Sequence, residues 1–206
     1  MNKDKFSVFD GLWKDNTILS ALMVIFPVIV CGNTLRNALA IIYAFSAITL
    51  FSVVIASFVP KNLPYTIRTI INAAIASLVY IPVKHMAVGF FPDVIPRTGI
   101  YFPLLAVNSI IILHTESKFF KMKKPEMIGS LVFYILGFDL IMLIISVIRE
   151  IFGHGTLNEN VININFISGL SEPFGGFVLL GLLCGLYRKM RSGNRISGGD
   201  KNVSDN

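Results

Sequence analysis

The chain has 206 residues, of which 54% are hydrophobic and only 15% are charged, and its mean hydropathy is +0.70. Soluble domains carry about 25% charged residues, so this composition excludes an ordinary soluble domain and indicates a membrane protein. The net charge of +6 predicts no nucleic-acid partner, because the cations lie in short loops and at the two ends rather than in a basic stripe.

Six apolar segments follow one another along the chain, with polar residues between them. Their approximate bounds are 17–31, 37–59, 67–90, 100–113, 127–152 and 173–187. The second, third and fifth are long enough to cross a hydrocarbon core of about 30 Å, which takes roughly 20 helical residues. The first and fourth offer only about 15 helical residues each. Both are therefore predicted to be short or broken helices whose bare backbone is sheltered by protein. The sixth is also short.

The first and fourth segments resemble each other. The first contains Phe26-Pro27-Val28-Ile29-Val30, and the fourth contains Phe102-Pro103-Leu104-Leu105-Ala106. Each opens a half of three segments, and since three is odd, the second half is inverted relative to the first. Paired short segments that contain proline indicate an inverted repeat with a site at the midplane. The predicted fold is an all-α membrane protein with six transmembrane segments in two inverted three-helix repeats, 17–90 and 100–187, joined by a loop at 91–99.

The distribution of basic residues predicts the orientation. With six crossings, one side of the membrane receives 14 of the 18 lysines and arginines and the other side four. Cytoplasmic loops carry the excess of Lys and Arg, so both termini are expected in the cytoplasm. We expect a multi-pass protein of a bacterial inner membrane, with a cytoplasmic N-terminus at 1–16 and a disordered polar tail at 188–206.

Five polar residues within or beside the apolar segments are candidates for an ion path: Asn33, Thr34, Asn108, Ser109 and Asp139. Asp139 lies in the middle of the fifth segment, where a lone carboxylate is costly and usually faces a partner or water. The other four follow the prolines of the two short segments, where broken helices offer carbonyls and small polar groups to a cation. The alternative is plain hydrogen bonding between helices or, for Asp139, with a neighbouring protein.

Other residues are predicted to have structural roles. Pro27 and Pro103 mark the short segments, and the run Arg149-Glu150-Ile151-Phe152-Gly153-His154-Gly155 ends the fifth segment as an interfacial ion pair and helix stop. Gly181 and Gly185 are expected to permit close helix approach. Cys31 and Cys184 form no disulfide framework or spaced metal motif. No motif for covalent catalysis is present, so any enzymatic role would belong to a larger assembly.

Several sequence runs resemble the family of integral-membrane subunits that includes RnfE (RsxE) and NqrD. The carriers lie between Gly11 and Met190 and are Gly11-Leu12-Trp13-Lys14-Asp15-Asn16, Asn37-Ala38-Leu39, Phe102 to Asn108, Glu116, Arg149 to Leu157, Pro173 to Phe177 and Gly181-Leu182. The resemblance implies two inverted halves with broken first and fourth helices. It also implies a multi-subunit complex that couples electron transfer between ferredoxin or NADH and NAD or quinone to translocation of Na⁺ or H⁺. The implied partners are membrane lipid, a sister six-span subunit, and subunits that carry flavin and iron–sulfur clusters.

One departure concerns a cofactor. The resemblance implies that each of two sister subunits contributes two cysteines to a shared iron–sulfur cluster, at the positions that are Phe26 and Ser109 here. Phenylalanine offers no ligand atom, and serine is a poor substitute for the usual thiolate. Cys31 is the remaining candidate thiol near the first position. We therefore expect no cofactor in this chain.

The sequence thus predicts an integral subunit of an Rnf/Nqr-type complex that scaffolds the assembly and helps to form its ion path. Two alternatives stay open. One is a stand-alone secondary transporter on the same inverted-repeat scaffold. The other is a scaffold or assembly subunit without a redox role.

Overall fold

The computed structural model describes residues 16, 18–19, 24–60, 62–108, 110–119, 122–158, 160–162 and 167–199. In this part of the chain, helices alternate with short turns and one small hairpin. The elements are α1 (Ile25–Cys31), α2 (Leu35–Ala56), α3 (Tyr65–Phe90), α4 (Val94–Thr98), η2 (Gly99–Tyr101), η3 (Pro103–Val107), η4 (Ile110–His114), α5 (Thr115–Ser117), α6 (Lys124–Arg149), η6 (Glu150–His154), β1 (Thr156–Leu157), β2 (Asn160–Val161), η7 (Ser168–Leu170) and α7 (Pro173–Gly199). Elements η4 and η6 are π-helical, and η2, η3 and η7 are 3₁₀ turns.

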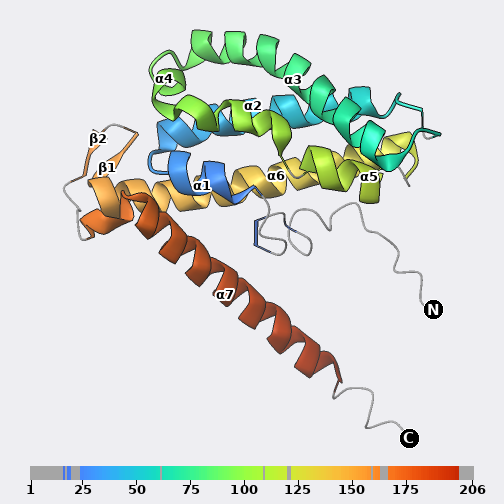
Figure 1. The fold of residues 1–206 in the computed structure, drawn as a ribbon. Helices are drawn as coiled ribbons and strands as arrows, with labels where there is room; N and C mark the ends of the chain where they lie inside the picture. Colours follow the sequence, from blue (N-terminus) through green and yellow to red (C-terminus); the bar gives the residue numbers. More distant parts are fainter. Residues whose placement is uncertain are drawn as a thin grey trace, which may run out of the picture.

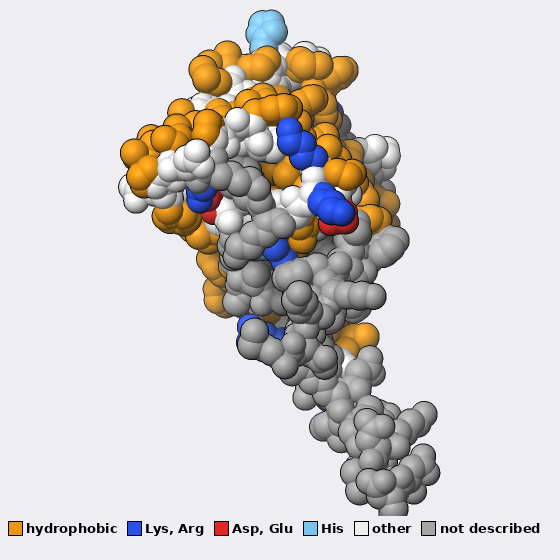
Figure 2. Space-filling view, turned by 90° about the vertical axis from the view of Figure 1, so that its right-hand side faces the viewer, with side chains coloured by type: hydrophobic (Ala, Val, Ile, Leu, Met, Phe, Trp, Pro, Cys, Tyr) orange, Lys and Arg blue, Asp and Glu red, His pale blue; other side chains and the backbone are white. Residues whose placement is uncertain are grey.

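Among the described residues, three helices are long and apolar enough to cross a membrane: α2, α3 and the continuous run from Lys124 to His154. A fourth span is possible if the bent pair Val94–Tyr101 and Pro103–His114 counts as one. Helix α2 packs against both α3 and α6 and lies between them (Figure 1). Hydrophobic side chains make up much of the described part of the face shown in Figure 2, as contact with acyl chains requires. The chain is thus an all-α membrane protein whose segments accommodate about six spans.

The first segment is short and broken, as its length predicted. Helix α1 has only seven residues, and the chain then leaves the helix at Gly32. Helix α2 begins after Thr34, whose hydroxyl accepts a hydrogen bond from the Asn37 backbone N–H at 3.3 Å and caps the helix. A polar break of three residues therefore separates the two helices.

The fourth segment is broken more severely. Pro103 opens η3, where its missing N–H is harmless, and the π-helical turn η4 follows after Asn108. The two parts of the segment meet at 43°. The loop predicted at 91–99 is wrong in part, because α4 occupies residues 94–98 and lengthens the broken segment toward the N-terminus.

The last two segments are longer than the apolar pattern indicated. Helix α6 continues as η6 to His154. Helix α7 reaches Gly199 and diverges from the bundle (Figure 1), so residues 188–199 are helical rather than disordered. Hydropathy marked where the apolar part of α7 ends, but a helix continues through polar residues wherever no proline or turn stops it.

Contacts between loops agree with alternating crossings. At one end of the bundle, Arg36 pairs with Asp93 at 3.2 Å. At the other end, the ammonium group of Lys124 lies 4.2 Å from the ring centroid of Phe58. The six-segment topology places the two members of each pair, which lie in loops or at helix ends, on one side of the membrane. The two halves also have the same order of elements, a broken segment followed by two long helices. Their inverted relation stays a prediction.

Substitutions of two glycines in α7 test how closely this helix packs against the turn before it. A Cβ at Gly175 would lie 2.3 Å from the Gly169 carbonyl oxygen, whereas nothing lies within 4 Å of a Cβ at Gly181. We expect Gly175→Ala to destabilise the protein by about 1–3 kcal/mol through overpacking. Gly181→Ala should be neutral or stabilising, by up to about 1 kcal/mol, because alanine favours the helix. Thermal unfolding in detergent measures both. Equal effects would show that α7 does not pack on the turn before it.

Candidate functional site

Arg149 is the last residue of α6 and is fully buried. Its guanidinium donates hydrogen bonds to five backbone carbonyls, those of Val28, Ile29, Leu170, Ser171 and Glu172, at 2.6–3.5 Å. The first two carbonyls belong to α1, whose end lacks helical partners for them, and the other three belong to the turn that leads into α7. A buried charge is tolerated only when it is hydrogen-bonded in this way. Arg149 therefore holds the carbonyl end of α1 against α6 and α7.

Glu150, the next residue, secures the other side of the break. One carboxylate oxygen accepts a hydrogen bond from the backbone N–H of Leu35 at 2.6 Å, and the other accepts one from the Thr156 hydroxyl at 3.4 Å. Leu35 is the first residue of α2, where a negative charge is favourable to the helix dipole. The sequence predicted an interfacial ion pair here. The structure corrects this, because both side chains are buried and bind backbone groups on the two sides of the break.

The glycines around this pair allow the close packing. A Cβ at Gly153 would lie 2.7 Å from the Ser171 nitrogen, and a Cβ at Gly176 would lie 3.2 Å from the Arg149 guanidinium carbon. Gly155 has a φ of 68°, a left-handed conformation that glycine adopts without strain. The predicted structural role of Gly153 and Gly155 thus has a physical basis in the geometry of the turn.

Asn108 secures the second break. Its side-chain oxygen accepts hydrogen bonds from the N–H groups of Ile110 and Ile111, both at 3.0 Å. Its amide nitrogen donates to the Thr49 hydroxyl and the Leu105 carbonyl. All the hydrogen-bonding capacity of the side chain is therefore used to cap η4 and to join it to α2. Ser109, the neighbouring candidate for the ion path, lies outside the described residues.

Asn16 repeats this pattern at a place that the sequence analysis assigned to the cytoplasm. Its side-chain oxygen accepts from the N–H groups of Ile18 and Leu19, and its amide nitrogen donates to the Gly137 carbonyl at 2.9 Å. Gly137 lies near the middle of α6, and Asn16 is only 1% exposed. The predicted cytoplasmic segment therefore ends inside the bundle. A polar residue just before an apolar run was the available signal.

A polar pocket of about 430 Å³ opens at the first break. Its lining residues are Val30, Cys31, Asn33, Thr34, Asn37, Arg97, Thr98, Tyr101 and His154. It brings together Asn33 and Thr34, two candidates for the ion path, and adds polar groups that sequence reasoning missed because they come from other segments. The Asn33 side-chain oxygen accepts a hydrogen bond from the Asn37 amide at 2.9 Å. The pocket offers neutral oxygens together with the side chains of Arg97 and His154.

A larger, mainly apolar cavity of about 670 Å³ lies where the two broken segments meet. Its lining residues are Val24, Phe26, Pro27, Ile29, Val30, Tyr101, Leu104, Leu105, Val107, Asn108, Pro173 and Phe177. The first and fourth segments therefore come together, as the paired prolines indicated. The Phe26 side chain is 68% exposed and offers the cavity only an aromatic ring.

Among the described residues that line this cavity, none offers a thiolate, the usual ligand of an iron–sulfur cluster. Phe26 stands at one of the two implied ligand positions, and Cys31 lines the polar pocket rather than this cavity. Within the described residues, no group of three or more His, Cys, Asp or Glu side chains is placed to hold a metal ion.

Asp139 lies apart from both pockets, in a groove between α2 and α6. One of its carboxylate oxygens accepts a hydrogen bond from the Ser46 hydroxyl at 2.9 Å. Ser46 precedes Thr49 by about one turn of α2, and Thr49 holds Asn108. The candidates for the ion path that the structure describes thus do not form one cluster: Asn33 and Thr34 share a pocket, while Asn108 and Asp139 lie at separate places along α2.

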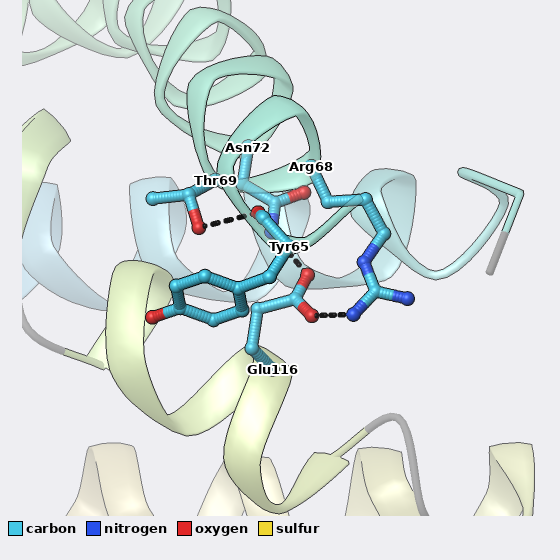
Figure 3. Close-up of polar contacts among 5 residues, drawn as sticks. All are labelled: Tyr65, Arg68, Thr69, Asn72 and Glu116. Carbon is cyan, nitrogen blue, oxygen red and sulfur yellow. Dashed lines mark hydrogen bonds and ion pairs between the residues drawn. The ribbon is translucent and has the colours of Figure 1, made fainter. Parts of the chain in front are cut away.

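A buried ionic cluster joins the two halves of the chain (Figure 3). Arg68 on α3 pairs with Glu116 on α5 at 2.5 Å, and the Asn72 amide nitrogen donates to the other Glu116 oxygen at 3.2 Å. Asn72 is fully buried, and the Glu116 side chain is only 3% exposed. Sequence reasoning used Glu116 as a marker of resemblance but missed this contact, whose partners are 44 and 48 positions apart.

These features define a polytopic α-helical membrane protein built around two protected helix breaks. A family model described as "Rnf-Nqr subunit, membrane protein" matches residues 5–184. The chain belongs to this Rnf-Nqr family, as the sequence analysis predicted.

Curated relatives have consistent names. The chain is 27% identical to the E subunit of the ion-translocating oxidoreductase complex of Shewanella amazonensis, in an alignment of length 208 that covers 89% of this chain and 86% of the relative. It is 31% identical to the D subunit of the Na⁺-translocating NADH-quinone reductase of Chlamydia pneumoniae over 150 residues, 72% of this chain and 70% of the relative. The E subunit of the ion-translocating oxidoreductase complex of Haemophilus ducreyi is 29% identical over 154 residues, 75% of this chain and 68% of the relative. All three relatives are named as subunits, so membership implies other subunits as partners.

Replacing Arg149 with lysine tests the hydrogen bonds that join the end of α1 and the turn before α7 to the end of α6. Lysine has three donors for five carbonyls and cannot reproduce the planar fork, so we expect a loss of about 3 kcal/mol of stability. The matched control is Arg36→Lys, whose ion pair with Asp93 is solvent-exposed and should cost less than about 1 kcal/mol. Unfolding midpoints in detergent compare the two. Arg149 would have no special role if both variants behaved alike.

Proposed function

We propose that this chain is a membrane subunit of an ion-translocating redox complex of the Rnf/Nqr type, and that the polar pocket at its first helix break lines part of the ion path. The observation that carries the proposal is the pairing of Arg149 with the end of α1 and of Glu150 with the start of α2. The names of the relatives, which describe an ion-translocating complex and a Na⁺-translocating reductase, support the same assignment.

The chemistry of the break suits passage of a cation. Arg149 and Glu150 already neutralise the two helix ends, so the groups left for a cation are neutral amide and hydroxyl oxygens. Asn33 and Thr34 supply such oxygens in the pocket. Arg97 also lines the pocket but is exposed, so solvent screens its charge. Binding by neutral oxygens is weak enough for an ion to leave again, which conduction requires. Asn108 and Asp139, at separate places along α2, are further candidates for the path, and Ser109, the remaining candidate, lies outside the described residues.

The orientation of the chain belongs to the same proposal. The excess of lysine and arginine on one side supports cytoplasmic termini in a bacterial inner membrane. We assign the sister six-span subunit that the resemblance implies to the apolar cavity at Phe26, where the two broken segments meet. Flavin and iron–sulfur clusters are assigned to other subunits.

One observation favours a second candidate, a scaffold without a redox role. Phe26 presents no ligand atom to the cavity where the resemblance places a cluster. Such a scaffold would still need both helix breaks, because they position α1 and η3 in the bundle.

The lack of a thiolate at Phe26 leads to a prediction about iron. We expect Cys31→Ser and Cys184→Ser to leave the iron content and the electron paramagnetic resonance spectrum of the purified complex unchanged. Both thiols are buried, and Cys31 lines the polar pocket rather than the apolar cavity. Loss of one cluster signal in the Cys31 variant would assign a ligand to this chain and refute the expectation.

The pocket at the first break leads to a prediction about transport. Asn33→Ala removes one neutral oxygen but only one side-chain hydrogen bond, so assembly should persist. Redox-driven uptake of Na⁺ or H⁺ by proteoliposomes that contain the complex should fall several-fold per assembled complex. Asn62→Ala is the control, because Asn62 is exposed in the loop between α2 and α3. Unchanged uptake in the Asn33 variant would remove this pocket from the path. Uptake by the chain alone would favour a stand-alone transporter.

A further inference from the structure

The groove that holds Asp139 opens on the outside of the bundle and is otherwise almost entirely apolar. It has a volume of about 410 Å³ and lies between α2 and α6. Its lining residues are Ile42, Tyr43, Ser46, Ala47, Leu50, Val132, Ile135, Leu136 and Asp139. Asp139 lies about 22 Å along α6 from Lys124 and about 15 Å from Arg149, at a rise of 1.5 Å per residue. The carboxylate is therefore near the middle of the span.

This carboxylate has an incomplete set of partners. Its Oδ2 accepts a hydrogen bond from Ser46, but its buried Oδ1 has no hydrogen-bond partner among the described residues. The residues that line the groove include no basic side chain. An ionised carboxylate near the bilayer centre costs about 2.5–3.5 kcal/mol even on lenient scales, and acyl chains cannot donate a hydrogen bond to it. With lipid alone in the groove, the charge of Asp139 therefore has neither a counter-charge nor a second hydrogen-bond donor.

The surface beside Asp139 is shaped for another helix. Five apolar side chains spaced four residues apart form a ridge along α6, each 37–47% exposed: Ile128, Val132, Leu136, Leu140 and Ile144. Ridges with this spacing interdigitate with those of a neighbouring helix. Lipid would cover the ridge equally well, so the carboxylate decides between the two occupants. A mid-membrane carboxylate complements a mid-membrane cation, and each removes the cost of burying the other.

We propose that a transmembrane helix of another subunit packs into the groove between α2 and α6 and places a lysine or arginine side chain on Asp139. The proposal rests on the proposed function, because it requires the chain to be part of a complex. It adds a specific surface and a specific chemistry of contact.

Photocrosslinking in the assembled complex tests the surface. A benzophenone amino acid in place of Leu136 reports what lies in the groove in native membranes. The expected product is a covalent adduct with another membrane subunit, mapped by mass spectrometry to a helix that has a lysine or arginine within one turn of the crosslink. Adducts with lipid only, or with a second copy of this chain, would overturn the proposal.

Substitutions of Asp139 test the chemistry. Asp139→Leu should lower recovery of the crosslinked partner per chain about tenfold, a change of about 1.4 kcal/mol. Asp139→Asn keeps the size of the side chain and the bond with Ser46 but loses the charge, so it should give a smaller loss. Exchanging charges, with Asp139→Lys in this chain and aspartate at the crosslinked basic position of the partner, should restore recovery.

The two proposals fail in different ways. If Asp139→Leu retains the partner in full, or is more stable than the wild type, the groove faces lipid and only the docking proposal falls. If the wild-type chain purifies from membranes in mild detergent without any other subunit, the proposed function falls as well. Thermal unfolding of each purified variant separates loss of docking from loss of folding.

Discussion

Two adjacent side chains of opposite charge make a broken helix tolerable in this protein. A break in a membrane helix leaves carbonyls on one side and amides on the other without partners, and lipid can satisfy neither. Arg149 binds the carbonyl end of α1, and Glu150 binds the amide end of α2. Because these residues adjoin at the end of α6, one helix end fixes both sides of the break. The polar pocket and the start of α7 depend on that arrangement, since Arg149 also binds the turn that precedes α7.

The two halves of the chain solve the same problem with different chemistry. The first break is secured by charges from a distant helix, whereas the second is secured by the neutral side chain of Asn108 within its own segment. The first break consequently opens on a polar pocket, and the two broken segments meet across a mainly apolar cavity. The Arg68–Glu116 pair then ties a helix of the first half to the second. Similar sequence patterns have therefore produced two unlike surfaces.

Sequence reasoning succeeded where the physics is local. Segment length predicted the short first helix and the broken fourth one, and glycines predicted the turn after α6. It failed where a contact joins distant positions. Glu150 and Leu35 are 115 positions apart, so an interfacial ion pair was the natural interpretation of Arg149-Glu150. The same limit hid the burial of Asn16 against Gly137 and the separation of Asp139 from Asn33. The end of α7 was misplaced because hydropathy reports membrane exposure rather than helix continuity.

The contacts that hold the helix breaks are separate from Phe26, the position at which the resemblance implies a cluster ligand. The hydrogen bonds that hold the breaks come from Arg149, Glu150 and Asn108, and none of them involves the side chain of Phe26. The phenylalanine at that position offers no metal ligand, and the backbone of α1 is anchored through the carbonyls of Val28 and Ile29. The hydrogen bonds that hold the helix breaks are thus independent of any cluster at the apolar cavity. A thiolate at this position, which the resemblance implies for the family, would bear on electron transfer rather than on how the helices are held.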